Sequence, residues 1–121
     1  MENIKTIFVS KEATSDKLKL RDSEGHKPGD DNLTTYVDAG DTVRWELDGS
    51  DSGLSEIFKI EKKRDTHNIL KAAPEPVDGY WLAIVKDPSP GKGKTEKYKI
   101  GYKIKDRGEK HWDDPKLQMN N

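Results

Sequence analysis

Five aromatic and polar residues in the second half of the chain have the chemistry to hold a ligand: Tyr80, Trp81, His111, Trp112 and Asp113. An exposed indole or phenol ring stacks on a sugar ring or a peptide side chain, and a nearby carboxylate accepts hydrogen bonds from the same ligand. These residues form the predicted ligand-binding site. The competing interpretation is that the rings cap a core that is short of aliphatic area.

The segment Gly91–Thr95 contains the glycine, lysine and threonine of a phosphate-binding loop. The full pattern, G-x-x-x-x-G-K-[ST], requires a glycine at position 88, where the chain has Pro88. Such a loop must also open a helix, whereas the residues after Thr95 alternate like a strand. The segment therefore predicts a loop rich in lysine and glycine and no nucleotide site.

The segment Asp48–Gly53 has oxygen-bearing side chains at alternate positions, as calcium loops do. An EF-hand is excluded, because its closing glutamate would fall at position 59, which is Lys59. A different calcium site that adds Glu56 or Asp41 is one hypothesis. A solvated turn selected for its Asp, Ser and Gly residues is the other.

Metal and catalytic signatures are sparse. The chain has no cysteine, which excludes disulfides, thiolate metal sites and thiol catalysis. His26, His67 and His111 show no metal-ligand spacing, although distant histidines can converge on zinc in a fold. We predict no catalytic residue, no metal site and no cofactor. A small metal-dependent or acid–base enzyme that uses dispersed histidines and carboxylates is kept as an alternative.

The clearest element is a strand over residues 97–105, where lysines alternate with Tyr98, Ile100, Tyr102 and Ile104. This pattern is typical of an antiparallel strand with one buried and one wet face. The lysine face would attract an anion, but proteins that read nucleic acids interleave such lysines with exposed aromatics. Because Tyr98 and Tyr102 fall on the buried face, we expect a solvated face and no nucleic-acid partner. Gly101 predicts a bulge or a close backbone approach.

A second strand, Thr42–Leu47, places Trp45 in phase with Val43 and Leu47, which predicts a core position for Trp45. Tyr80 and Trp81 must face opposite sides of their strand, and Trp112 falls in a segment with the composition of a polar loop. The other predicted strands are Ile4–Val9, Leu18–Arg21, Leu33–Val37, Ile57–Glu61, Tyr80–Val85 and Leu117–Met119. A helical turn is predicted only within Arg64–Ala73, where Pro74 would end it.

Seven or eight short strands in 121 residues predict an all-β, Greek-key β-sandwich with at most one short helix. The length fits a single domain spanning residues 1–121. About residues 22–32 and 87–95 are predicted to be flexible loops, because turn-forming residues dominate them.

The run Ala39-Gly40-Asp41-Thr42-Val43-Arg44-Trp45 resembles the Gly-Asp-x-Val-x-Trp strand opening of cupredoxin-like domains. The later Tyr-x-Ile-x-Tyr-x-Ile strand, followed by a short closing strand, is similar to the end of that fold. The resemblance implies that the Greek-key sandwich is cupredoxin-like, and an immunoglobulin-like sandwich is the alternative. It does not imply a blue-copper site, because the chain lacks the cysteine ligand and the spacing of His111 and Met119 does not fit. The implied protein is a copper-free relative.

No motif in the sequence assigns an activity, and the preferred hypothesis is a noncatalytic binding or protein-interaction module. The partner is an unknown ligand or protein. The formal net charge is −1, with an acidic first half and a basic second half. This asymmetry suits complementary faces within one fold or between copies, so a self-assembling structural subunit, a homo-oligomer, is a further alternative. No segment has the apolar run of a signal peptide or of a membrane span, so we expect a cytoplasmic protein without a membrane partner.

Overall fold

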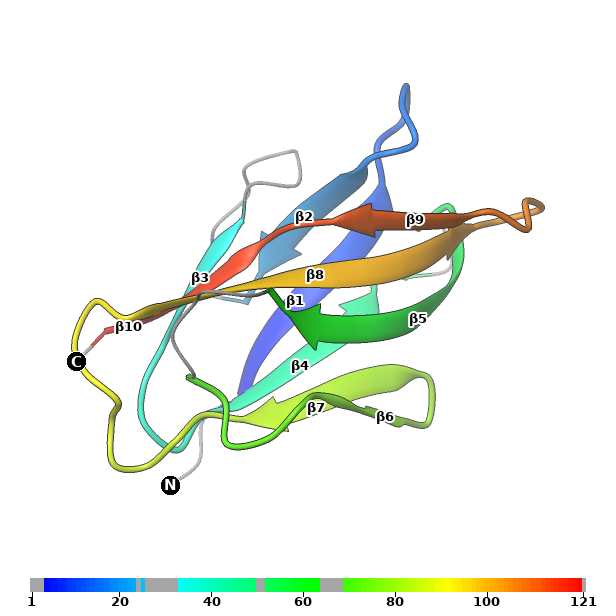
Figure 1. Ribbon diagram of the computed structural model, residues 1–121. Helices are drawn as coiled ribbons and strands as arrows, with labels where there is room; N and C mark the ends of the chain where they lie inside the picture. The colour runs from blue at the N-terminus through cyan, green and yellow to red at the C-terminus, as the bar shows by residue number, and fades with distance from the viewer. Residues whose placement is uncertain (1–3, 24, 26–32, 50–51, 64–68, 121) are drawn as a thin grey trace.

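Two five-stranded sheets form the protein (Figure 1). The computed structural model describes residues 4–23, 25, 33–49, 52–63 and 69–120. The first sheet has the order β2-β1-β4-β7-β6, with β1 (Ile4–Lys11), β2 (Leu18–Asp22), β4 (Thr42–Leu47), β6 (Glu75–Val77) and β7 (Tyr80–Ile84). The second has the order β3-β10-β8-β5, with β9 also paired to β8. Its strands are β3 (Thr34–Val37), β5 (Leu54–Lys62), β8 (Thr95–Ile104), β9 (Lys110–Asp113) and β10 (Lys116–Met119).

The predicted all-β sandwich is confirmed, and each of the eight predicted strands is present. The predicted strand number was too low, because β6 and β9 are additional short strands. The β1–β4 and β3–β10 pairs are parallel, and the other pairs are antiparallel. β9 and β10 follow one another along the same side of β8, while β5 pairs with its other side (Figure 1). Strand β8 is therefore the long central strand of the second sheet.

The predicted helical turn is not found in the described part of Arg64–Ala73, which is residues 69–73. There, Leu70 instead forms an antiparallel bridge with Val85. The predicted loop boundaries also shift, since Asp22 belongs to β2 and Thr95 to β8. Residues 24 and 26–32 lie outside the described residues, and the flexibility of both loops stays a prediction.

The core lies between the sheets, as the alternation along β4 and β8 predicts. Trp45 is fully buried and Tyr98 nearly so. Their rings meet edge to face, with centroids 5.4 Å apart. The indole Nε1 of Trp45 donates a hydrogen bond to the Tyr98 hydroxyl oxygen at 3.0 Å. Burial raises the pKa of the Tyr98 phenol, so this hydroxyl stays neutral and available as the acceptor for the indole.

Side-chain hydrogen bonds link the two sheets along both sides of the sandwich. On one side, Thr35 Oγ1 of β3 donates to Asp22 Oδ2 of β2 at 2.8 Å. On the other, Trp81 Nε1 of β7 donates to the carbonyl oxygen of Ile57 in β5 at 3.1 Å. These contacts satisfy buried polar groups that would otherwise destabilise the edges. They fix the relative position of the two sheets.

Candidate functional site

The structure separates the five residues of the predicted ligand site. Tyr80 and Trp81 belong to β7 in the first sheet, and the other three belong to β9 in the second. As predicted, Tyr80 and Trp81 face opposite sides. Trp81 points into the core and is only 7% exposed, whereas Tyr80 faces outward beneath the guanidinium of Arg44, 3.9 Å from its ring centroid. The first pair therefore offers no exposed double aromatic platform.

On β9, His111 and Asp113 lie on the same side of the sheet as Tyr102. The His111 ring stacks on the Tyr102 ring, with centroids 5.5 Å apart. Asp113 is buried, and its Oδ2 accepts the backbone N–H of Leu18 at 2.7 Å. Asp113 is therefore a structural acceptor, and its predicted position at an exposed ligand surface was wrong. Its carboxylate is occupied because β9 lies against the turn that leads into β2.

Trp112 is the residue of the predicted set that faces solvent from the second sheet, with 40% of its surface exposed. The prediction that it lies in a polar loop was wrong, because residues 110–113 pair with residues 100–103 of β8. Tyr80 and Trp112 are thus the outward-facing aromatics of the set, and they lie on the opposite outer faces of the sandwich. The five residues do not line one common surface.

The metal hypotheses find no common centre in the described residues. His26, His67, Ser50 and Asp51 lie outside them, and within the described ranges no group of three histidines and carboxylates is placed to hold a metal ion.

The proposed calcium ligands are held apart. Asp48 accepts two hydrogen bonds from Arg21, both at 2.9 Å, which lower the pKa of this carboxyl. Glu56 pairs with Lys103 at 3.2 Å. Asp41 lies just before β4 and Asp48 just after it, and the strand between them separates the two residues by about 20 Å. These three carboxylates therefore cannot share one ion.

The outward side of the second sheet brings together residues that are distant in sequence. Trp112 of β9 lies directly opposite Gly101 of β8, and Phe58 reaches over the same glycine from β5. The two rings meet edge to face, with centroids 5.1 Å apart. A Cβ atom at residue 101 would lie 2.7 Å from Phe58 Cζ and 2.9 Å from Trp112 Cζ3. Sequence analysis predicted a bulge or a close backbone approach at Gly101. The structure has a register shift between Ile57 and Lys59 of β5 opposite this residue, and the groups that approach Gly101 are two side-chain rings, for which only glycine leaves room.

Lysines surround this aromatic pair. Lys99 Nζ lies 4.6 Å from the centroid of the Trp112 ring, and Lys110 Nζ lies 5.3 Å from that of Phe58. Further lysines of β8 and β10 continue the same outward face. We call this surface the lysine–aromatic face and define it by Phe58, Lys97, Lys99, Lys103, Lys110, Trp112 and Lys116.

Two lysine pairs on this face lie directly opposite each other across neighbouring strands. Lys97 of β8 faces Lys116 of β10, and Lys103 of β8 faces Lys110 of β9. No ion pair in the described residues engages Lys97, Lys110 or Lys116, whereas Lys103 is paired with Glu56 as noted. Like charges placed opposite one another destabilise a sheet. The face therefore carries uncompensated positive charge.

The charge of Lys99 is balanced by a second carboxylate on this side of the sheet, since Lys99 Nζ lies 3.3 Å from Glu61 Oε1. Asp114, between β9 and β10, is paired with Lys63 at 2.9 Å. The sequence contained one signal for this surface, namely the lysine face of residues 97–105. The proximity of Trp112 to Phe58 and Gly101 could not be predicted in this way, because it depends on strand pairing.

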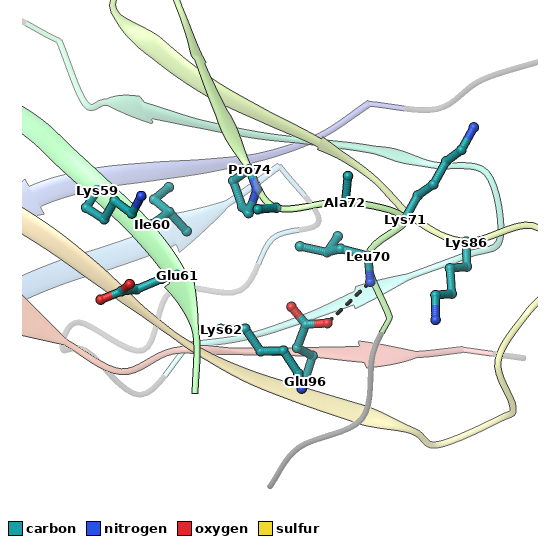
Figure 2. Close-up of a pocket in the computed structure, with 11 residues that line it drawn as sticks. Lys59, Ile60, Glu61, Lys62, Leu70, Lys71, Ala72, Pro74, Lys86 and Glu96 are labelled. Atoms are coloured by element: carbon teal, nitrogen blue, oxygen red, sulfur yellow. Dashed lines mark hydrogen bonds between the residues drawn. The ribbon is translucent and has the colours of Figure 1, made fainter. Parts of the chain in front are cut away.

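A separate pocket of about 470 Å³ opens between the end of β5 and the segment before β6 (Figure 2). Glu96 lies at its base, and its Oε1 accepts the backbone N–H groups of Ile69 at 2.8 Å and Leu70 at 3.3 Å. Burial raises the pKa of the Glu96 carboxyl, against the opposing effect of these two hydrogen bonds and of Lys62 and Lys86. Sequence analysis missed Glu96, because its partners are distant along the chain.

The lysines that line this pocket do not converge on one point. In Figure 2 the ammonium group of Lys71 points away from Glu96, whereas the side chain of Lys86 extends in the other direction, toward the side on which Glu96 lies. The one side-chain carboxylate at the base is already bound to backbone amides. The arrangement of Glu96 is thus that of a tether, which holds residues 69–70 against β8.

We expect the Glu96→Gln variant to gain stability relative to the native protein as the pH rises from 4 to 7. The folded state binds the Glu96 proton more tightly than the unfolded chain does, so ionisation above the ordinary carboxyl pKa lowers the native protein's stability. Glutamine keeps the oxygen that accepts both amides and cannot ionise. Urea unfolding at several pH values measures the difference, with exposed Glu75→Gln as control. An advantage of Glu96→Gln that grows on acidification would contradict this assignment.

Comparisons with known proteins show the fold alone. No known family profile matches the chain, and no curated protein is similar to it in sequence. The crystal structure of the inclusion body protein PixA from Burkholderia cenocepacia is similar, with a TM-score of 0.64, 12% identity, and coverage of 98% of this chain and 96% of that one. A cysteine protease inhibitor from Entamoeba histolytica aligns over 98% and 97% of the two chains at 15% identity and a TM-score of 0.40. The latter likeness is too weak to support an argument.

Within the described ranges, no helix has the length and apolarity to span a membrane.

Proposed function

We propose that the protein is a noncatalytic binding module that binds polyanions through the lysine–aromatic face. The observation that carries the proposal is the directly opposed pair of Lys97 and Lys116, neither of which forms an ion pair within the described residues. Lys110 adds a third such lysine, opposite Lys103, whose charge is paired with Glu56. The mutual repulsion of Lys97 and Lys116 costs stability in the free protein. A polyanion laid across the strands would offset that repulsion and release counterions from its own charges.

The charge distribution supports this proposal. The face has five lysines, and Glu56 and Glu61 are the carboxylates paired with them in the described structure. The chain as a whole has a net charge of −1, so the positive charge on this surface is a local property. Such a local field raises the encounter rate with anions, and the effect falls steeply with added salt.

PixA, which has a similar fold, is described as an inclusion body protein. The likeness supplies no partner, so the partner class is argued from the charges above. The enzyme and self-assembly hypotheses stay predictions, because no specific contact in the described residues favours either.

Fluorescently labelled dextran sulfate is a suitable probe, since it carries dense negative charge and no aromatic group. We expect the protein to bind it at low salt and to lose affinity steeply between about 50 and 200 mM salt, as counterion release requires. The double variant Lys97→Glu/Lys116→Glu should weaken binding by about tenfold or more, because two repulsive contacts replace two attractive ones. Fluorescence anisotropy measures both effects.

The matched control is Lys19→Glu/Lys71→Glu, which makes the same change in net charge away from the lysine–aromatic face. Lys19 lies on β2 of the other sheet and Lys71 precedes β6, and both are exposed. We expect the control to change affinity by less than about twofold. Equal losses in the two double variants, or no binding by the native protein at low salt, would overturn the proposal.

A further inference from the structure

We infer that the polyanion bound by the lysine–aromatic face is single-stranded nucleic acid. This inference rests on the proposed function and adds to it the role of the aromatic pair. Single strands present two kinds of group in alternation along the chain: phosphates, and bases with accessible ring faces. A face built from lysines alone would serve any polyanion, so the choice depends on Phe58 and Trp112.

Sequence analysis argued against nucleic acid because the aromatics of β8 itself, Tyr98 and Tyr102, face the core. That placement is confirmed, with both residues at most 2% exposed. Strand pairing nevertheless brings aromatics onto the lysine side from the neighbours, Phe58 from β5 and Trp112 from β9. Lysines interleaved with accessible aromatics, the arrangement typical of proteins that bind single strands, are therefore present on this face.

The exposure of Trp112 is what a stacking platform needs. With 40% of its surface in solvent, its ring can be covered by a base without unfolding the sheet. Gly101 lies beneath both rings, and the missing side chain lets Phe58 support Trp112 from the side. Because Phe58 packs edge to face against the indole, the Trp112 side chain is already held in place. Little of its conformational freedom is therefore lost when a base stacks on it.

The spacing of the lysines suits an extended strand. Lys97 and Lys99 occupy alternate outward positions of β8, which places their Cα atoms about 6.7 Å apart. This distance is close to that between successive phosphates in an extended single strand. Lys99 Nζ also lies over one face of the Trp112 ring, at 4.6 Å from its centroid. A base that stacked on that face would displace the ammonium group, which would then be within reach of the phosphate of the same nucleotide.

Alternative polyanions lack one of these two contacts. The bases of a duplex are stacked on one another and present their edges in the grooves, so the ring of Trp112 cannot lie on a base face. An acidic peptide supplies carboxylates but no row of π faces. The aromatic pair therefore favours single strands over both.

The test compares labelled oligo(dT) and oligo(rU) of about 15 nucleotides with a duplex of equal length, polyglutamate and dextran sulfate. We expect the single strands to bind more tightly than the other three probes. Replacing Trp112 with alanine should weaken single-strand binding by about tenfold, the loss of about one stacked base. The same change should leave dextran sulfate affinity within about twofold, because the lysines are untouched.

Two further variants separate stacking from damage to the fold. Trp112→Phe keeps an aromatic platform and should retain most of the single-strand affinity. Tyr80→Leu removes the outward aromatic of the opposite sheet face and should change nothing. Quenching of tryptophan fluorescence by unlabelled oligo(dT) reports the contact directly, since Trp45 and Trp81 are buried. This quenching should be lost in Trp112→Phe.

The outcomes for the two proposals are distinct. Binding of dextran sulfate through the lysines, with no preference for single strands and no effect of Trp112→Ala on them, would overturn this inference and leave the proposed function standing. Tighter binding of duplex or polyglutamate than of oligo(dT) would overturn it in the same way. Failure of every polyanion to bind would remove both proposals.

Discussion

Trp45→Ala should destabilise the protein by about 3–5 kcal/mol, a large part of the stability of a domain this size. The indole is fully buried between the sheets, and its removal leaves a cavity that neighbouring strands cannot close. The substitution also removes the donor to the Tyr98 hydroxyl. Urea unfolding followed by circular dichroism measures the loss. The exposed residue Ile84 on β7 is the control, and Ile84→Ala should cost far less.

The hydrogen bond and the volume of Trp45 can be separated. Tyr98→Phe keeps the ring but leaves the buried indole N–H without its acceptor, which should cost about 1–3 kcal/mol. In the Trp45→Phe background the same Tyr98→Phe change should cost less, because no indole donor is then left unpaired. Additive losses in the double variant would show that the 3.0 Å contact contributes nothing beyond packing.

Sequence analysis predicted best those strands in which apolar and polar residues alternate along the strand itself. Trp45 in β4 and the tyrosines of β8 lie in the core as expected, because one sheet face is buried and the side-chain period is two. The same reasoning confirmed the opposite orientations of Tyr80 and Trp81. In each case the information is local, and a few residues of sequence contain it.

The segment around Trp112 shows where local information ends. Gly108 and Pro115 flank it and are typical of turns, so the composition predicts a loop. Its strand character arises from pairing with β8, which places Trp112 opposite Gly101. Similarly, Glu96 acts on the amides of Ile69 and Leu70, far away in sequence. Contacts of this kind are properties of the fold, and no spacing rule along the chain encodes them.

Strand pairing also decides the topology, which alternation cannot predict. The parallel pairs β1–β4 and β3–β10 join segments that the sequence gives no reason to align. The resemblance to cupredoxin-like domains and the Greek-key connectivity stay predictions, as does the cytoplasmic location. The coarser statement, two packed sheets without a helix in the described residues, is established by the structure and by its likeness to PixA.

The second large effect is expected at Asp113. The role of Asp113 is structural, whereas its neighbour Asp114 lies at the surface. Asp113→Ala removes the acceptor of the buried Leu18 N–H and a neighbour of the Tyr102 hydroxyl, 3.1 Å away. An orphaned buried donor that had bonded to a charged group should cost about 3 kcal/mol. Asp114→Ala breaks an exposed ion pair with Lys63 and should cost less than about 1 kcal/mol.

Thermal and urea unfolding of the two alanine variants, with Asp113→Asn as a third, tests this assignment. The asparagine retains an oxygen that can accept the Leu18 N–H, so Asp113→Asn should recover part of the stability lost in Asp113→Ala. If Asp113 were instead a ligand acceptor on an open surface, both its variants would be as stable as Asp114→Ala. That result would return Asp113 to the candidate binding residues. The expected result makes β9 a strand with two functions, since its inner side ties the sheets together through Asp113 while its outer side presents Trp112 to the partner.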